Sequence, residues 1–168
     1  MIGPAPLIST EHVTGTIPFA IRRRVKWGEC DPAGVVFTVV FAEYVISAAE
    51  LFYLVLFDGA LQRIKARLGF ATPTRALEFD FRSSLRPQDE FDMTVRVDEI
   101  RSRTYALAIV ARAPDGDDVF RARLTPICVA GEERRAIEIP AEFRSALERY
   151  RAECSAAANR ADNAIRAG

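Results

Sequence analysis

The sequence is poor in the residues that bind transition metals and form disulfide frameworks. Its 168 residues include three cysteines and one histidine. The cysteines, at positions 30, 128 and 154, are an odd and widely spaced set without a CxxC pair, which argues against a zinc site. His12 lies in the N-terminal segment, so a Cys–His nucleophile is also disfavoured. We expect reduced thiols and no bound metal.

The chain has no net charge, and we expect residues 1–18 not to be a secretory signal, because no basic start is followed by an apolar stretch. Its 23 Lys and Arg balance 23 Asp and Glu, so the protein as a whole is not attracted to nucleic acid or to an anionic membrane. The single long apolar run, 35–57, contains Glu43 and Glu50. A charge near the bilayer centre costs roughly 2.5–3.5 kcal/mol on insertion scales. We therefore expect a helix buried in a cytoplasmic protein, with neither a membrane nor a nucleic-acid partner.

Hydrophobic periodicity predicts one α+β domain. We expect a flexible arm over 1–17, a domain over 18–150, and the end of a helix with a tail over 151–168. Alternation predicts strands, and longer apolar patterns predict helices. The expected strands are 19–27, 74–84, 90–100, 103–113 and 119–129, and the expected helices are 38–57, 59–69 and 141–157. The helix over 38–57 is apolar nearly all round, so we expect an antiparallel sheet to wrap around it.

A turn before this helix carries the strongest chemical signal. In the segment Trp27-Gly28-Glu29-Cys30-Asp31-Pro32-Ala33-Gly34, the turn places the Asp31 carboxylate beside the start of a helix. Helix starts carry unpaired backbone N–H groups and partial positive charge. A carboxylate beside such donors suits attack on a carbonyl, as nucleophile or base, with the N–H groups holding the oxyanion. The same Asp could instead be an ordinary N-cap.

Two motifs resemble one enzyme family. The string VKWGECDPAGVVF, residues 25–37, resembles the signature of the 4-hydroxybenzoyl-CoA thioesterase family of hotdog-fold enzymes. The string RAIEIP, residues 135–140, is similar to the ending that precedes the family's last helix. Together the resemblance covers roughly 20–147. It implies a hotdog fold, with an antiparallel sheet around a long central helix. It also implies an acyl-CoA substrate attacked by Asp31, with coenzyme A as part of the substrate and no separate cofactor.

Other residues are candidates for the rest of this site. The predicted oxyanion donors are the backbone amides of Gly34, Val35 and Val36. Glu29 is either a second catalytic carboxylate or a residue that is solvated or caps the backbone. A basic cluster lies between two predicted strands, where the resemblance supports a site for the phosphates of CoA and where an exposed charged hairpin is the alternative. This cluster consists of Arg101, Ser102 and Arg103.

The residues after the motif indicate an apolar acyl group. Five residues are predicted to form the walls of the acyl pocket: Phe37, Thr38, Phe41, Val45 and Ile46. Each of them could equally belong to the ordinary hydrophobic core. Relative to the family pattern, Thr38 replaces a common His or Tyr, and Ile46 occupies the position of an acidic residue. A phenol hydroxyl would then have no partner, so we expect aryl or medium-length alkyl groups in preference to 4-hydroxybenzoyl.

The expected function is therefore acyl-CoA thioester hydrolysis. The alternatives are a thioesterase for acyl chains on acyl-carrier protein and a non-catalytic acyl-CoA binding protein. Since one sheet cannot cover an all-round apolar helix, we expect a homo-oligomer, a homotetramer built as a dimer of dimers. The resemblance implies active sites at subunit interfaces.

Overall fold

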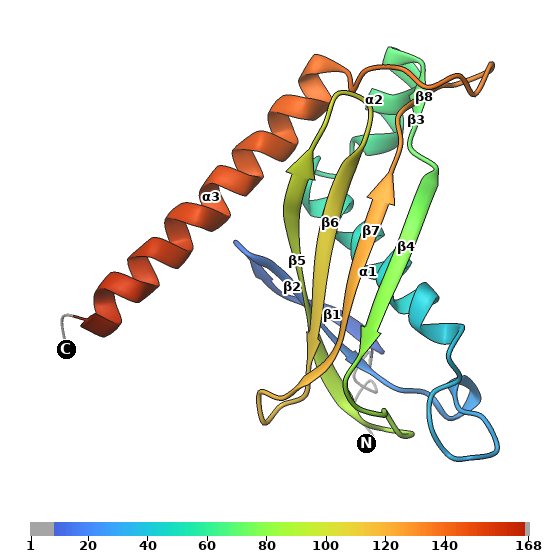
Figure 1. The fold of residues 1–168 in the computed structure, drawn as a ribbon, viewed down its shortest axis with the longest axis vertical. Coiled ribbons are helices and arrows are strands. Elements are labelled where there is room, and N and C mark those ends of the chain that lie inside the picture. Colours follow the sequence, from blue (N-terminus) through green and yellow to red (C-terminus); the bar gives the residue numbers. More distant parts are fainter. Residues whose placement is uncertain (1–8, 167–168) are drawn as a thin grey trace, which may run out of the picture.

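Six strands form one antiparallel sheet in the computed structural model, which describes residues 9–166 (Figure 1). The order across the sheet is β1-β2-β5-β6-β7-β4. Their bounds are β1 Glu11–Thr16, β2 Phe19–Arg24, β4 Thr74–Phe81, β5 Glu90–Ile100, β6 Tyr105–Arg112 and β7 Asp118–Pro126. Two short strands, β3 (Phe70–Ala71) and β8 (Val129–Ala130), pair separately. Strands β4 and β1 are therefore the two edges of the main sheet.

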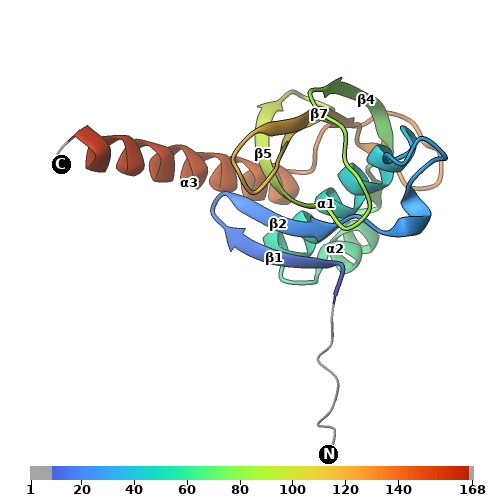
Figure 2. The ribbon, with the colours of Figure 1, turned by 90° about the horizontal axis from the view of Figure 1, so that it is seen from below.

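The sheet curves around helix α1 (Val40–Leu56), as Figure 2 shows. Aromatic rings join the helix to the strands, because Phe52 packs edge-on against Phe19 and Phe41 against Phe120. The buried residues of α1 are Phe41, Tyr44, Val45, Ala48, Ala49, Phe52 and Tyr53. This confirms the predicted α+β architecture, in which the apolar helix is buried by protein.

Helix α1 is followed by α2 (Leu61–Leu68), which begins after a sharp bend. Within residues 9–166, no single helix is long and apolar enough to cross a bilayer. Only α1 and α2 taken together meet the length and composition of a span, and they are bent by 82° at the break between them.

Two boundaries differ from the prediction. The predicted arm contains β1, whose register pairs His12 with Arg22. Since β1 is an edge strand with mostly exposed side chains, its sequence does not need the apolar alternation by which strands are found. The last helix, α3, runs over Ala141–Arg166, well past position 157, and projects from the body (Figure 2). Alanine has the highest helix propensity, so this alanine-rich half stays helical without packing. The part of the predicted arm over 1–8 lies outside the described residues.

Candidate active site

The Asp31 turn is closed by its own backbone and side chain. The Asp31 Oδ1 accepts a hydrogen bond from the Ala33 N–H at 2.8 Å, and the Asp31 carbonyl accepts one from the Gly34 N–H at 2.9 Å. The Asp31 N–H donates to the Val35 carbonyl at 2.9 Å. Gly34 has φ +78°, which a side chain would disfavour. Within residues 9–166 the Asp31 Oδ2 makes no hydrogen bond, so this oxygen is available for chemistry.

Asp31 does not cap a helix, contrary to one interpretation of the sequence. Helix α1 begins only at Val40, and its N-cap is Val39. The chain instead turns back after Gly34, because the Phe37 N–H donates to the Glu29 carbonyl at 2.9 Å. This reversal brings Asp31 to the helix start in space. Asp31 shares a surface hollow of 310 Å³ with Phe37 and Val40.

Two of the three predicted oxyanion donors are occupied. The Gly34 N–H closes the Asp31 turn, and the Val36 N–H donates to the Leu85 carbonyl at 2.9 Å. Neither amide can hold an oxyanion without losing these bonds, so the prediction fails for Gly34 and Val36 in this conformation. The Val35 N–H has no backbone acceptor among the described residues, and its role stays a prediction.

The Glu29 carboxylate is held inside the protein. It accepts hydrogen bonds from Arg23 Nη2 at 2.6 Å, from the Tyr44 hydroxyl at 2.8 Å and from the Lys26 N–H at 2.8 Å. Burial acts to raise the pKa of Glu29, but these three donors outweigh it and lower the pKa below its ordinary value. The occupied carboxylate favours backbone capping over the role of a second catalytic carboxylate.

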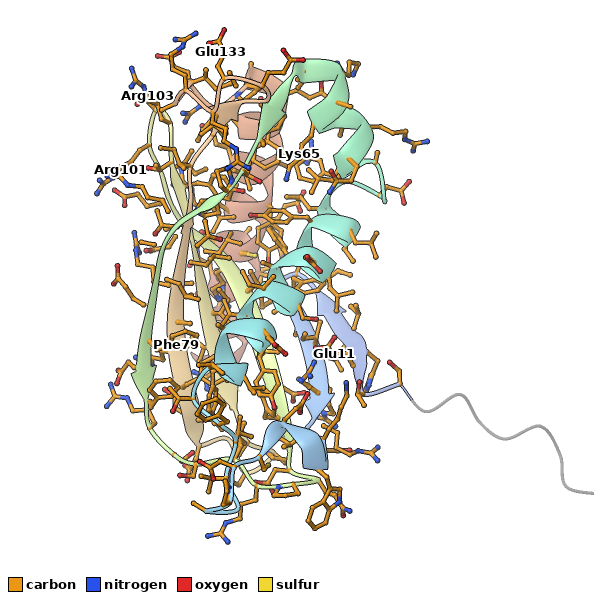
Figure 3. The ribbon with its side chains drawn as sticks, turned by 90° about the vertical axis from the view of Figure 1, so that its right-hand side faces the viewer. Glu11, Lys65, Phe79, Arg101, Arg103 and Glu133 are labelled. Carbon is orange, nitrogen blue, oxygen red and sulfur yellow. The ribbon has the colours of Figure 1, made fainter. Side chains whose placement is uncertain are left out.

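Arg23 connects Glu29 to the rest of the domain. Its guanidinium also pairs with Glu11 of β1 and lies over the Tyr44 ring, 4.3 Å from the ring centroid. Glu11, which Figure 3 labels, in turn accepts a hydrogen bond from the Ser47 hydroxyl of α1 at 2.7 Å. This cluster ties β1, β2 and α1 to the short helix η1 (Trp27–Glu29) that leads into the Asp31 turn. Sequence reasoning missed the cluster, although the alternation of Phe19 and Ile21 along β2 would have pointed Arg23 inward.

The predicted acyl-pocket residues do not share one pocket within a single chain. Phe37 lines the Asp31 hollow, whereas Thr38 and Phe41 line a neighbouring hollow of 340 Å³. Val45 is fully buried and belongs to the core, contrary to the pocket assignment. Ile46 lies further along α1 and lines a separate groove. The assignment treated these residues as one wall, but successive helix positions face different sides.

The predicted phosphate-binding cluster lies at the other end of the sheet. Residues 101–103 form the turn between β5 and β6, and Arg101 pairs with Glu99 at 2.7 Å. The Asp31 turn adjoins the start of β5, since Val36 donates to Leu85. The eleven residues of β5 span roughly 30 Å, so one chain does not bring Asp31 and this turn together. Figure 3 shows Arg101 and Arg103 at one end and segment 27–39 (light blue) at the other.

Apolar side chains of segment 27–39 and of the neighbouring hollow remain exposed. These side chains and their exposed fractions are Trp27 72%, Phe37 52%, Val39 61% and Phe81 46%. On α1, Leu54 is 54% and Val55 40% exposed. The single sheet therefore leaves part of α1 uncovered. Phe37 lines the Asp31 hollow and Phe81 lines the neighbouring one, and exposed apolar patches are typical of an interaction surface.

The family follows from comparison of the sequence with family models. A model described as the thioesterase-like superfamily matches residues 25–147. The chain belongs to the thioesterase-like superfamily. This confirms the predicted family and the predicted class of enzyme, a thioester hydrolase. No curated protein matches the sequence.

Solved structures support the hotdog fold. A 1,4-dihydroxy-2-naphthoyl-CoA thioesterase from Synechocystis is 22% identical, with a TM-score of 0.68 over 77% of this chain and 94% of that one. A 4-hydroxybenzoyl-CoA thioesterase variant bound to 4-hydroxybenzoyl-CoA is 20% identical, with a TM-score of 0.67 over 83% and 99%. A Staphylococcus aureus protein, SAV2348, in complex with CoA is 13% identical, with a TM-score of 0.73 over 87% and 88%. At these identities the likeness shows the fold alone.

Proposed function

We propose that the protein is a cytoplasmic enzyme that hydrolyses acyl-CoA thioesters, with Asp31 as nucleophile or general base. The carrying observation is the Asp31 carboxylate, fixed through Oδ1 by its own turn and facing a hollow through which a thioester could approach. The other nearby carboxylate, Glu29, is already committed to Arg23 and Tyr44. These contacts support a division of tasks in which Glu29 holds the segment and Asp31 performs the chemistry.

The Asp31 carboxylate can act in either of two ways at this site. In direct attack, Asp31 Oδ2 bonds to the carbonyl carbon, the thiolate of CoA leaves, and water then hydrolyses the anhydride. In general-base catalysis, Asp31 removes a proton from water as the water attacks the same carbon; the carbon–sulfur bond then breaks, and the proton passes from Asp31 to the departing thiolate of CoA. The Val35 N–H is the donor we propose for the developing oxyanion.

The acyl group that fits best is apolar. Phe37 and Val40 wall the Asp31 hollow with aromatic and aliphatic surface. A buried phenol hydroxyl without a partner costs roughly 1–3 kcal/mol. We therefore expect benzoyl and medium-length alkyl groups to be hydrolysed in preference to 4-hydroxybenzoyl.

We also propose a homo-oligomer, a dimer of dimers, in which a partner completes the site. The support is the exposed apolar part of α1, the edge position of β4, and the position of Asp31 and the turn at 101–103 near opposite ends of β5, a strand of roughly 30 Å. Antiparallel pairing of two β4 edges would place the Thr74 end of one strand beside the Phe81 end of the other. A partner's Arg101 and Arg103 would then approach the end of the sheet at which Asp31 lies.

A panel of acyl-CoA thioesters, followed with a thiol-detecting dye, tests the proposed function. We expect thiol release from benzoyl-CoA and hexanoyl-CoA, and slower release from 4-hydroxybenzoyl-CoA. Binding of acyl-CoA without turnover would favour a non-catalytic binding protein. Turnover restricted to acyl groups on acyl-carrier protein would favour that carrier. If 4-hydroxybenzoyl-CoA were the best substrate, the apolar pocket assignment would be wrong.

A further inference from the structure

Glu11 begins a series of polar contacts that ends at the Asp31 turn. Its Oε1 accepts a hydrogen bond from Arg23 Nη1, and its Oε2 accepts one from the Ser47 hydroxyl at 2.7 Å. The register of the sheet places Glu11 of β1 directly opposite Arg23 of β2. One carboxylate therefore fastens the Arg23 guanidinium to both the edge strand and the central helix.

The Arg23 guanidinium has little freedom to move between its two carboxylates. Its side chain is 8% exposed, and its Nη2 donates to Glu29 Oε1 at 2.6 Å, while Nη1 bonds Glu11. Its Nε is buried without a hydrogen-bond partner among residues 9–166, so the two carboxylates set its orientation. Because a guanidinium is a rigid plane, a shift at the Glu11 end also moves the end that holds Glu29.

Glu29 passes this position on to the backbone around Asp31. Its Oε2 accepts a hydrogen bond from the Lys26 N–H at 2.8 Å, at the start of η1. Its carbonyl accepts one from the Phe37 N–H at 2.9 Å. A single residue therefore holds both ends of segment 26–37, and the Asp31 turn lies between them.

The charges that these contacts need are maintained. Burial acts to lower the pKa of Arg23, but Glu11 and Glu29 outweigh it and raise the pKa above its ordinary value. Burial also raises the pKa of Tyr44, so its phenol stays protonated and donates to Glu29. A buried ion pair is weak evidence for added stability, because the desolvation of two charges offsets their attraction. The geometry that the pairs fix is the better reason for them.

We propose that Glu11 is a positioning residue for thioester hydrolysis. It acts through Arg23 and Glu29 on the Asp31 turn. The proposal rests on the proposed function and adds a residue from outside the matched segment 25–147. A displacement of about 1 Å at a catalytic group costs roughly 10²-fold in rate. Because Glu11 acts through two other side chains, we expect a smaller loss, about tenfold.

Two substitutions of Glu11 test the proposal in the thiol-release assay with benzoyl-CoA. Glu11→Ala should lower kcat about tenfold and change KM by less than about twofold. Glu11→Gln should recover most of the rate, because its amide keeps an oxygen for Arg23 and an N–H for the Ser47 hydroxyl. Added to Glu29→Gln, Glu11→Ala should lower kcat by less than about twofold, since both changes break the same series of contacts.

Asp92→Ala is the matched control. Asp92 pairs across strands with Arg22 at 2.8 Å, as Glu11 does with Arg23, but the Arg22 and Asp92 side chains are 40% and 35% exposed. Arg22 and Arg23 are neighbours on β2 and therefore face opposite sides of the sheet. The control should leave kcat and KM unchanged.

NMR relaxation of backbone amides measures the turn without any catalysis. The Ala33 and Gly34 N–H groups close the Asp31 turn. Their order parameters should fall from about 0.85, the value for rigid backbone, towards about 0.6 in Glu11→Ala. Asp92→Ala should not change them. Ser47→Ala releases only one end of Glu11 and should lower kcat about threefold, which tests the same contacts without the loss of a charge.

Thermal melting establishes that each variant is folded. Wild-type kcat in a folded Glu11→Ala would overturn the proposal, even with a lowered Tm, because Glu11 would then serve stability alone. Unchanged order parameters in that variant, or an equal loss of kcat in Asp92→Ala, would also overturn it. A failure of the proposed thioesterase would appear separately, as absence of thiol release by the wild type while the turn amides still respond to Glu11→Ala.

Discussion

Replacement of Asp31 by asparagine should abolish most catalysis and leave the fold nearly intact. Asparagine keeps the Oδ1 atom that accepts the Ala33 N–H at 2.8 Å. The bonds to Gly34 and Val35 use only the backbone of residue 31. The Asp31 carboxylate forms no ion pair with another described residue. We therefore expect the free energy of unfolding to change by less than about 0.5 kcal/mol, a shift in Tm of about 1–2 °C.

The effect on rate should be much larger. A neutral amide is a poor nucleophile and does not accept a proton from water. Loss of general-base catalysis lowers kcat by about 10²–10⁴, which corresponds to roughly 2.7–5.4 kcal/mol in activation free energy. The increase in activation free energy should therefore exceed the change in the free energy of unfolding by several kcal/mol.

Asp31→Ala is the matched control for this variant. It removes the same charge and also the hydrogen bond to Ala33, which is worth about 1 kcal/mol. Asp31→Asn and Asp31→Ala should be equally inactive in the thiol-release assay, while the alanine variant should melt about 2–4 °C lower. Turnover close to the wild-type rate in a folded Asp31→Asn would refute the mechanism.

Three further predictions concern the supporting residues. Glu29→Gln should destabilise the protein by about 1–3 kcal/mol in urea unfolding at neutral pH. Because the folded-state pKa of Glu29 is lowered, the wild-type advantage should shrink as the pH falls below the ordinary value of 4.5, and a pH-independent difference would contradict this. Arg101→Ala and Arg103→Ala should raise KM for CoA esters more than they lower kcat. The exposed control Arg160→Ala should change neither constant. An unchanged KM in the first two variants would show that the turn is an ordinary charged hairpin. Light scattering should give a multiple of 18.7 kDa, and an active monomer would rule out the shared site.

Local sequence was sufficient for the central helix, for most of the main sheet and for the Asp31 turn, but not for the edge strand β1 or the full length of α3. Strand alternation and the apolar helix over 38–57 are properties of neighbouring residues, since a side chain's face is fixed by its position along a strand or helix. The Asp-Pro-Ala-Gly turn is equally local, because its bonds join residues at most a few positions apart. For the same reason the pattern indicated the curved sheet and its central helix before any contact was known.

Tertiary structure decided which of the polar groups are free to react. Glu29 and Asp31 are both carboxylates in one short segment, and only the packing of Arg23 and Tyr44 against Glu29 distinguishes them. Glu11 reaches Ser47 across 36 positions, and no periodicity encodes such a contact. The groove that Ile46 lines likewise forms only when α1, α2 and the sheet come together. Hydrophobic patterns depend on residues that are close in the sequence, whereas hydrogen-bond partners depend on which strands pair and which faces pack together.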